Sequence, residues 1–188
     1  MNRRDVITRL SLLLGGTIIG ADAFISGCAP TDKQVNNLFK SSDVALFDEI
    51  SETILPATTT PGAKAAKVGD FMAVMVQDCY TEKDQKVFTD GLRKMQEDFN
   101  KQYNTSFAKG TIEQRTAFLT ALDKEQKAFQ ATKKKDDSSH YFRMMKELTL
   151  LGFFTSEVGA TKALRYVEVP GKFDGSAPYK KGDKAWAT

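Results

Sequence analysis

The chain has 188 residues, of which 41% are hydrophobic, a length and composition typical of one folded domain with a sizeable core. Its 27 basic and 24 acidic residues leave a net charge of only +3, which gives no electrostatic footprint for nucleic acid. Two cysteines and one histidine are too few for a disulfide framework, a four-cysteine zinc site or a multi-histidine metal centre.

The first 27 residues have the pattern of an export signal. Arg3 and Arg4 precede an apolar run over Leu10–Ala21, and small residues then lead to Cys28. This order is typical of a secretory signal, and the apolar run is too short to span a membrane. The arginine pair resembles a twin-arginine signal, which carries folded proteins, although an ordinary positively charged start is the alternative. The ending Ile25-Ser26-Gly27-Cys28 resembles a bacterial lipobox, in which Cys28 receives lipid; the alternative is a chance cysteine near an ordinary cleavage site.

We therefore expect an exported, periplasmic chain that is attached to a membrane by lipid on Cys28. The expected organisation is a removable signal over 1–27, a tether over 28–42, a helical domain over 43–165 and an extended C-terminal tail over 166–188. Cys79 would then be the remaining thiol, and an unpaired thiol in an exported protein is most often buried and inert.

Helical periodicity predicts an all-α fold, a compact multi-helix domain with an irregular, aromatic-containing C-terminal tail. Apolar residues recur at helical spacing in five segments, which begin near Asp43, Val68, Thr81, Thr111 and Ser139. Pro56 ends the first segment, because the residue before a proline is disfavoured in the α region. Thr81 is placed to cap the third segment, and Thr111 with Gln114 forms a capping box at the start of the fourth.

The segment over 139–154 is the most apolar part of the mature chain, which predicts a buried central helix. An apolar surface that faces another subunit is the alternative. Lys133–Asp137, just before it, is expected to be a solvated loop, with a contact to a lipid surface as the alternative. The tail after Arg165 is rich in glycine and proline and cannot form its own core, so it should lie along this domain or along a partner.

The sequence contains none of the catalytic or cofactor-binding motifs that we sought. There is no dinucleotide-binding glycine motif, no Cys-x-x-Cys-His haem attachment and no Gly-x-Ser-x-Gly nucleophile elbow. His140 begins an apolar helix, where a structural or surface role is expected in preference to a haem ligand or a proton carrier. We therefore assign no catalytic, cofactor-binding or metal-binding residue to this chain.

Four stretches in order resemble the gluconate 2-dehydrogenase subunit 3 family. They are the leader ending at Cys28, the stretch Ile54–Ala63 continuing to Phe71, the stretch Asp78–Thr81, and the stretch Lys146–Thr161 running on to Gly171 and Gly175. The last stretch, KELTLLGFFTSEVGAT, is the most specific. The sequence departs from the family at Thr59, where an acidic residue is common.

The resemblance implies a non-catalytic small subunit of a membrane-associated, flavin-dependent sugar or polyol dehydrogenase. The partner would be a large FAD protein of the glucose-methanol-choline (GMC) oxidoreductase type, and a multi-haem cytochrome c would accept the electrons. This chain would support folding, twin-arginine export and anchoring of the FAD subunit. The candidate interface comprises aromatic and acidic residues of the last third of the chain: Phe153, Phe154, Glu157, Tyr166, Phe173, Tyr179 and Trp186. The alternatives are a free-standing periplasmic lipoprotein that acts as a scaffold or binds a ligand, and catalysis at an unrecognised site.

Overall fold

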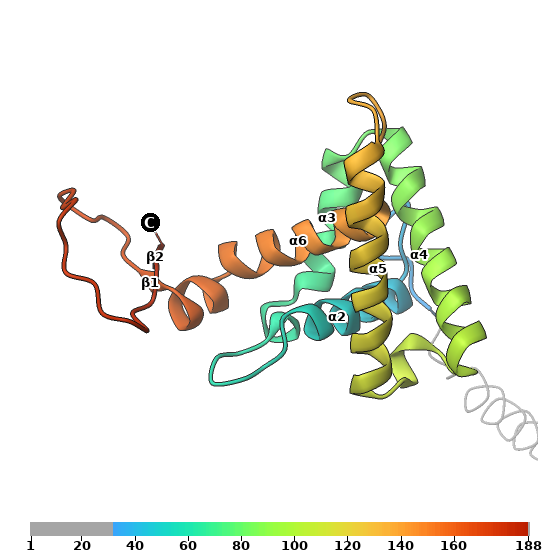
Figure 1. Cartoon of the computed structure of the whole chain (residues 1–188), viewed down its shortest axis with the longest axis horizontal. Coiled ribbons are helices and arrows are strands. Elements are labelled where there is room, and N and C mark those ends of the chain that lie inside the picture. Colours follow the sequence, from blue (N-terminus) through green and yellow to red (C-terminus); the bar gives the residue numbers. More distant parts are fainter. Residues whose placement is uncertain (1–31, 188) are drawn as a thin grey trace, which may run out of the picture. The chain divides into compact units, whose positions relative to one another are not determined.

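The computed structural model describes residues 32–187, so Arg3, Arg4 and Cys28 lie outside the described residues. Gln34–Thr188 forms a compact unit of its own. Its long helices are α2 (Ser41–Ile54), α3 (Val68–Cys79), α4 (Glu82–Tyr103), α5 (Ile112–Thr132) and α6 (Tyr141–Thr155). Short turns η1 (Ala63–Ala66), η2 (Phe107–Lys109) and η3 (Gly159–Ala163) connect them, and strands β1 (Arg165–Tyr166) and β2 (Trp186–Ala187) follow. This arrangement confirms the predicted all-α fold (Figure 1).

The helix ends lie close to where the sequence predicts them. α2 ends at Ile54, two residues before Pro56. The Thr81 hydroxyl accepts a hydrogen bond from the Asp84 N–H and caps α4. Thr111 and Gln114 form the predicted capping box of α5. Local capping chemistry therefore sets these boundaries.

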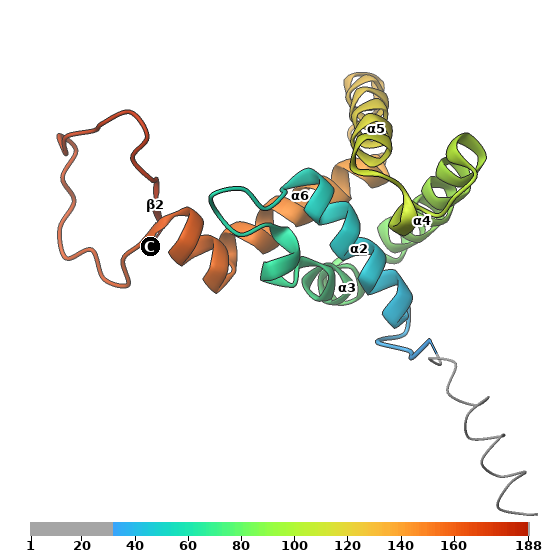
Figure 2. The same ribbon diagram turned by 90° about the horizontal axis from the view of Figure 1, so that it is seen from below.

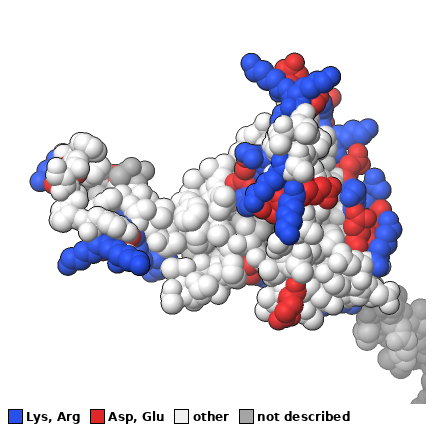
Figure 3. All heavy atoms as spheres, viewed as in Figure 1, with Lys and Arg blue, Asp and Glu red and all other residues white. Residues whose placement is uncertain are grey.

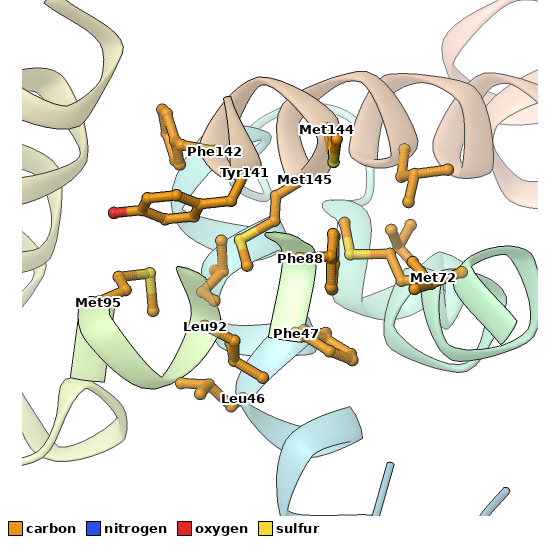
Figure 4. Close-up of a cluster of buried hydrophobic side chains, with 14 of the residues drawn as sticks. Leu46, Phe47, Met72, Phe88, Leu92, Met95, Tyr141, Phe142, Met144 and Met145 are labelled. Carbon is orange, nitrogen blue, oxygen red and sulfur yellow. The ribbon is translucent and has the colours of Figure 1, made fainter. Parts of the chain in front are cut away.

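Helix α6 is the element on which the others assemble. α2, α3, α4 and α5 all contact it (Figures 1 and 2). Figure 4 shows the centre of the core, where large apolar side chains of four helices meet. They include Leu46, Phe47, Met72, Phe88, Leu92, Met95, Tyr141, Phe142, Met144 and Met145, all buried.

Phe39 extends the core toward the N-terminal side. Its ring is buried and packs edge-on against Phe47 and Phe88, with centroid distances of 5.2 and 6.0 Å. The Asn36 amide donates to the Ala73 carbonyl of α3 at 2.9 Å. Residues 34–40, which we assigned to the tether, thus contact the domain.

Two sets of ion pairs join helices that are distant in sequence. Glu49 of α2 pairs with Arg115 of α5 at 2.6 Å and with Lys64 of η1 at 2.5 Å. Asp123 of α5 pairs with Lys146 of α6 at 2.6 Å. Hydrogen bonds from Lys127 and Lys146 lower the pKa of Asp123 to about 2. These carboxylates are engaged in holding helices together.

Two sequence expectations are wrong at single positions. Phe129 continues the helical spacing of apolar residues in the fourth predicted segment, which predicts that it faces the core, but it is 42% exposed and its ring contacts His140 edge-on. Cys79, expected to be buried, is exposed, because α3 ends there and the chain turns away at Tyr80.

Candidate partner-binding surface

Helix α6 changes character along its length. Its first half is enclosed by other helices, so that Tyr141, Phe142 and Met145 are buried. In its second half Leu150, Leu151 and Phe154 remain 38%, 46% and 39% exposed. We call these three residues the α6 stripe. The predicted buried helix is therefore confirmed for the first half of α6, and the second half leaves apolar side chains exposed.

Small residues hold the second half of α6 tightly against the domain. Gly152 faces Phe71 of α3, and a Cβ at this position would lie 2.6 Å from the Phe71 ring. The Thr149 hydroxyl is buried and donates to the Met145 carbonyl at 2.8 Å. Positions 149 and 152 thus face inward, which turns positions 150, 151 and 154 outward on the same helix. The exposure of the stripe follows from the helical period.

Phe153, which we predicted to lie at the interface, belongs to the core. It is 4% exposed, which puts its side chain out of reach of a partner. Its ring packs edge-on against Phe154 with centroids 5.1 Å apart. The buried Phe153 ring therefore supports the Phe154 ring, whose outer face remains exposed to solvent.

The surface around the α6 stripe carries few charges. Arg143 and Glu147 form a salt bridge of 2.7 Å on the first half of α6, and the next charged residue along the chain is Glu157, which is exposed. In the view of Figure 3, few charged side chains lie over the second half of α6, between the tail and the helices α4 and α5. An apolar, weakly charged patch of this kind is typical of a protein contact site.

The other predicted interface residues lie beyond η3. Tyr166, Phe173, Tyr179 and Trp186 are 51%, 96%, 76% and 58% exposed. Parallel pairing of β1 with β2 aligns Arg165 with Trp186 and Tyr166 with Ala187, so it brings Tyr166 and Trp186 onto adjacent strands. Phe173 and Tyr179 lie in the loop between the strands. The tail is closed on itself and is mostly exposed, which the sequence did not predict.

Leu150 and Leu151 were not predicted from the sequence to be surface residues. They belong to a nearly continuous apolar run, and apolarity alone cannot separate its inner from its outer members. Their positions in the helical period could have predicted the exposure. Residues 150, 151 and 154 lie on the face of the helix opposite the small, inward-facing Thr149 and Gly152.

His140 is a structural residue, as predicted. Its Nδ1 accepts the Phe142 N–H at 3.2 Å and so caps the start of α6. Its ring stacks on Tyr141 with centroids 4.5 Å apart. Burial lowers the pKa of His140, which keeps the ring neutral and able to accept that hydrogen bond.

The loop between α2 and η1 is organised by Glu52. Its carboxylate accepts the Ala57 N–H at 2.8 Å and the Lys64 N–H at 2.9 Å. Thr59, the position that departs from the family pattern, is exposed at the tip. The carboxylate that shapes this loop therefore comes from the end of α2.

Within residues 32–187, no cluster of three or more His, Cys, Asp or Glu side chains could hold a metal ion. A surface hollow of about 320 Å³ lies between the α3–α4 junction and α6, and its walls include Tyr80, Asp84, Ser138 and Glu147. Hydrogen bonds from Ser138 and Thr81 lower the pKa of Asp84. No described helix is both long and apolar enough to cross a membrane.

Cys79 also borders this hollow, with its Sγ 3.9 Å from the Met75 Sδ. Because the thiol is exposed, we expect it to react rapidly with Ellman's reagent in the native chain. The measurement uses residues 28–188 with Cys28→Ser, which leaves one thiol, and Cys79→Ser as the blank. Reaction only after denaturant is added would contradict the exposed position.

The fold and this surface define a helical domain with an exposed apolar stripe on its central helix. The family model for gluconate 2-dehydrogenase subunit 3 matches residues 41–171, and the chain belongs to this family. It is an accessory subunit of this kind, and the family's description names one subunit of a larger dehydrogenase. No curated protein and no solved structure matches the chain.

Proposed function

We propose that this chain is the non-catalytic small subunit of a membrane-associated, flavin-dependent sugar or polyol dehydrogenase. Its partner is a large FAD protein of the GMC type, and a multi-haem cytochrome c accepts the electrons. The FAD and haem belong to those partners. The chain supports folding of the FAD subunit, carries it through the twin-arginine route and anchors it through lipid on Cys28.

The α6 stripe is the observation that carries this proposal. It is apolar, exposed and supported by a rigid core, and it lies inside the segment that the family model matches. A contact site shared by subunits of this family should lie inside that segment. Of the predicted interface residues, Phe154 belongs to the stripe, and Glu157 and Tyr166 follow it within the matched residues.

The proposed export role explains why a small subunit would need a signal and a contact site only. A flavoprotein must load its cofactor before export, and a route for folded proteins preserves the loaded state. The leader of the small subunit can then serve both chains, as the arginine pair at positions 3 and 4 suggests.

Lysines in the α6 stripe test the contact. We expect Leu151→Lys with Phe154→Lys to weaken binding of the flavoprotein at least a hundredfold, because burying two unpaired ammonium groups costs at least about 3 kcal/mol. The measurement is the amount of FAD protein retained by the tagged variant after purification from membranes. Both side chains are partly exposed in the free subunit, so its helical content should be unchanged.

Val35→Lys with Ile112→Lys is the matched control. These residues are 48% and 77% exposed and lie away from α6, in the segment before α2 and at the start of α5. The control should retain the flavoprotein at the level of the unaltered chain. Equal retention by the stripe variant would remove α6 from the contact, and a folded chain that retains no flavoprotein in any form would favour a free-standing lipoprotein.

A further inference from the structure

The last 23 described residues form a closed loop, 165–187, which we call the tail loop. The Arg165 N–H donates to the Ala185 carbonyl at 2.8 Å, and the Val167 N–H donates to the Ala187 carbonyl at 2.9 Å. The Arg165 guanidinium lies 4.4 Å from the centroid of the Trp186 ring, and Lys184 Nζ donates to the Lys162 carbonyl. The two ends of the loop are therefore held together just after η3, and the rest of the loop projects away from them (Figures 1 and 2).

The apolar side chains of the tail loop have no core to enter. Every residue over 168–186 is exposed, and Val169 and Phe173 reach 78% and 96%. These large apolar side chains are therefore accessible to a surface outside this chain. The aromatic side chains are spread along the tail loop and do not line one common pocket. The main contacts of a protein interface usually cluster in such a pocket.

Lysines lie close in sequence to three of the aromatic residues of the tail loop. Lys172 precedes Phe173, Lys180 and Lys181 follow Tyr179, and Lys184 lies two residues before Trp186. Asp174 and Asp183 each accept a backbone N–H within the loop, from Ser176 and Lys180 respectively. Glu168 is the third acidic residue, so five basic and three acidic side chains leave the tail loop a net charge of +2. Among the described residues, Lys172, Lys180 and Lys181 form no salt bridge.

Trp and Tyr beside Lys is the combination that suits the headgroup region of a bilayer. The amphipathic rings are placed at headgroup level, and the ammonium groups meet lipid phosphates. A bilayer surface also accepts scattered aromatics without a shaped pocket. The three aromatic–lysine neighbourhoods all lie after residue 171, where the family match ends, whereas the α6 stripe lies inside it.

We propose that the tail loop binds the surface of membranes that contain anionic lipids. Phe173, Tyr179 and Trp186 enter the headgroup region, and the neighbouring lysines bind phosphate groups. This contact is separate from the proposed contact of the α6 stripe with the flavoprotein, and either can fail without the other.

Trp186 is the only tryptophan in the chain, so its fluorescence reports directly on the tail loop. The test uses residues 28–188 with Cys28→Ser, because the helical unit and its core begin at residue 34 and the apolar leader would itself bind lipid. The vesicles contain phosphatidylcholine alone or an equal mixture with phosphatidylglycerol. We expect at least about tenfold tighter binding to the mixed vesicles, a shift of Trp186 emission to shorter wavelength, and weakening by salt.

Lys180→Ala with Lys181→Ala should weaken binding to the mixed vesicles about tenfold or more. The matched control is Lys83→Ala with Lys86→Ala, an equally charged exposed pair at the start of α4, which should leave binding unchanged. Equal losses in both variants would make the effect one of total charge and overturn the proposal. Unchanged Trp186 emission with both vesicle types would overturn it as well, and so would a Trp186 shift caused by the flavoprotein alone.

Discussion

Phe47→Ala lowers the free energy of unfolding by about 3–5 kcal/mol, a large part of the stability of a domain of this size. Phe47 is fully buried, and its ring packs edge-on against Phe39 and Phe88 at 5.2 and 5.7 Å. Truncation removes the ring and leaves a cavity between α2, α4 and the segment before α2. The measurement is urea unfolding followed by circular dichroism on residues 28–188 with Cys28→Ser.

Phe173→Ala is the control for the same chemical change at a surface site. Phe173 is 96% exposed, so its loss should change the free energy of unfolding by no more than about 0.5 kcal/mol. Similar values for the two variants would mean that the aromatic cluster around Phe47 is not part of the core.

Arg3→Lys with Arg4→Lys stops export of the flavoprotein if this chain carries its partner through the twin-arginine route. The double variant keeps the positive charge, so an ordinary secretory signal would tolerate it, whereas the twin-arginine route reads the arginine pair itself. We expect the FAD protein to remain in the cytoplasm with its cofactor bound and dehydrogenase activity in the periplasm to fall to background. Cell fractionation followed by flavin absorbance and activity measures both.

Arg9→Lys is the matched control within the proposed leader. It makes the same conservative change outside the pair and should leave export unaltered. Periplasmic flavoprotein at the normal level in the Arg3, Arg4 variant would contradict the shared-leader role, while leaving the contact through the α6 stripe to be tested separately.

Capping signals and apolar periodicity predicted most of the fold. Thr81, Thr111 with Gln114, and Pro56 each act through local backbone chemistry, which a sequence displays directly. The face of α6 that remains open could not be predicted in the same way. Whether Leu151 is covered depends on which helices pack against the second half of α6. The hydrophobicity of the sequence does not show this tertiary packing.

The exposure of the tail and of Cys79 also could not be predicted from the sequence. Aromatic side chains such as Phe173 suggested contact with the domain or a partner, but the parallel pairing of β1 with β2 joins residues about twenty positions apart and has no local signal. Cys79 was expected to be buried because free thiols usually are, yet its place at the end of α3 exposes it. Positions at helix ends depend on where the chain turns next.

We propose that this chain, a member of the gluconate 2-dehydrogenase subunit 3 family with an exposed apolar stripe on α6, works by binding a flavoprotein. The most direct measurement is purification of the natively expressed, tagged chain from membranes, followed by flavin absorbance and protein stoichiometry of the eluate. We predict an equimolar FAD protein that oxidises a sugar or polyol with an added acceptor dye. A folded chain that elutes alone, without flavin, would contradict the account.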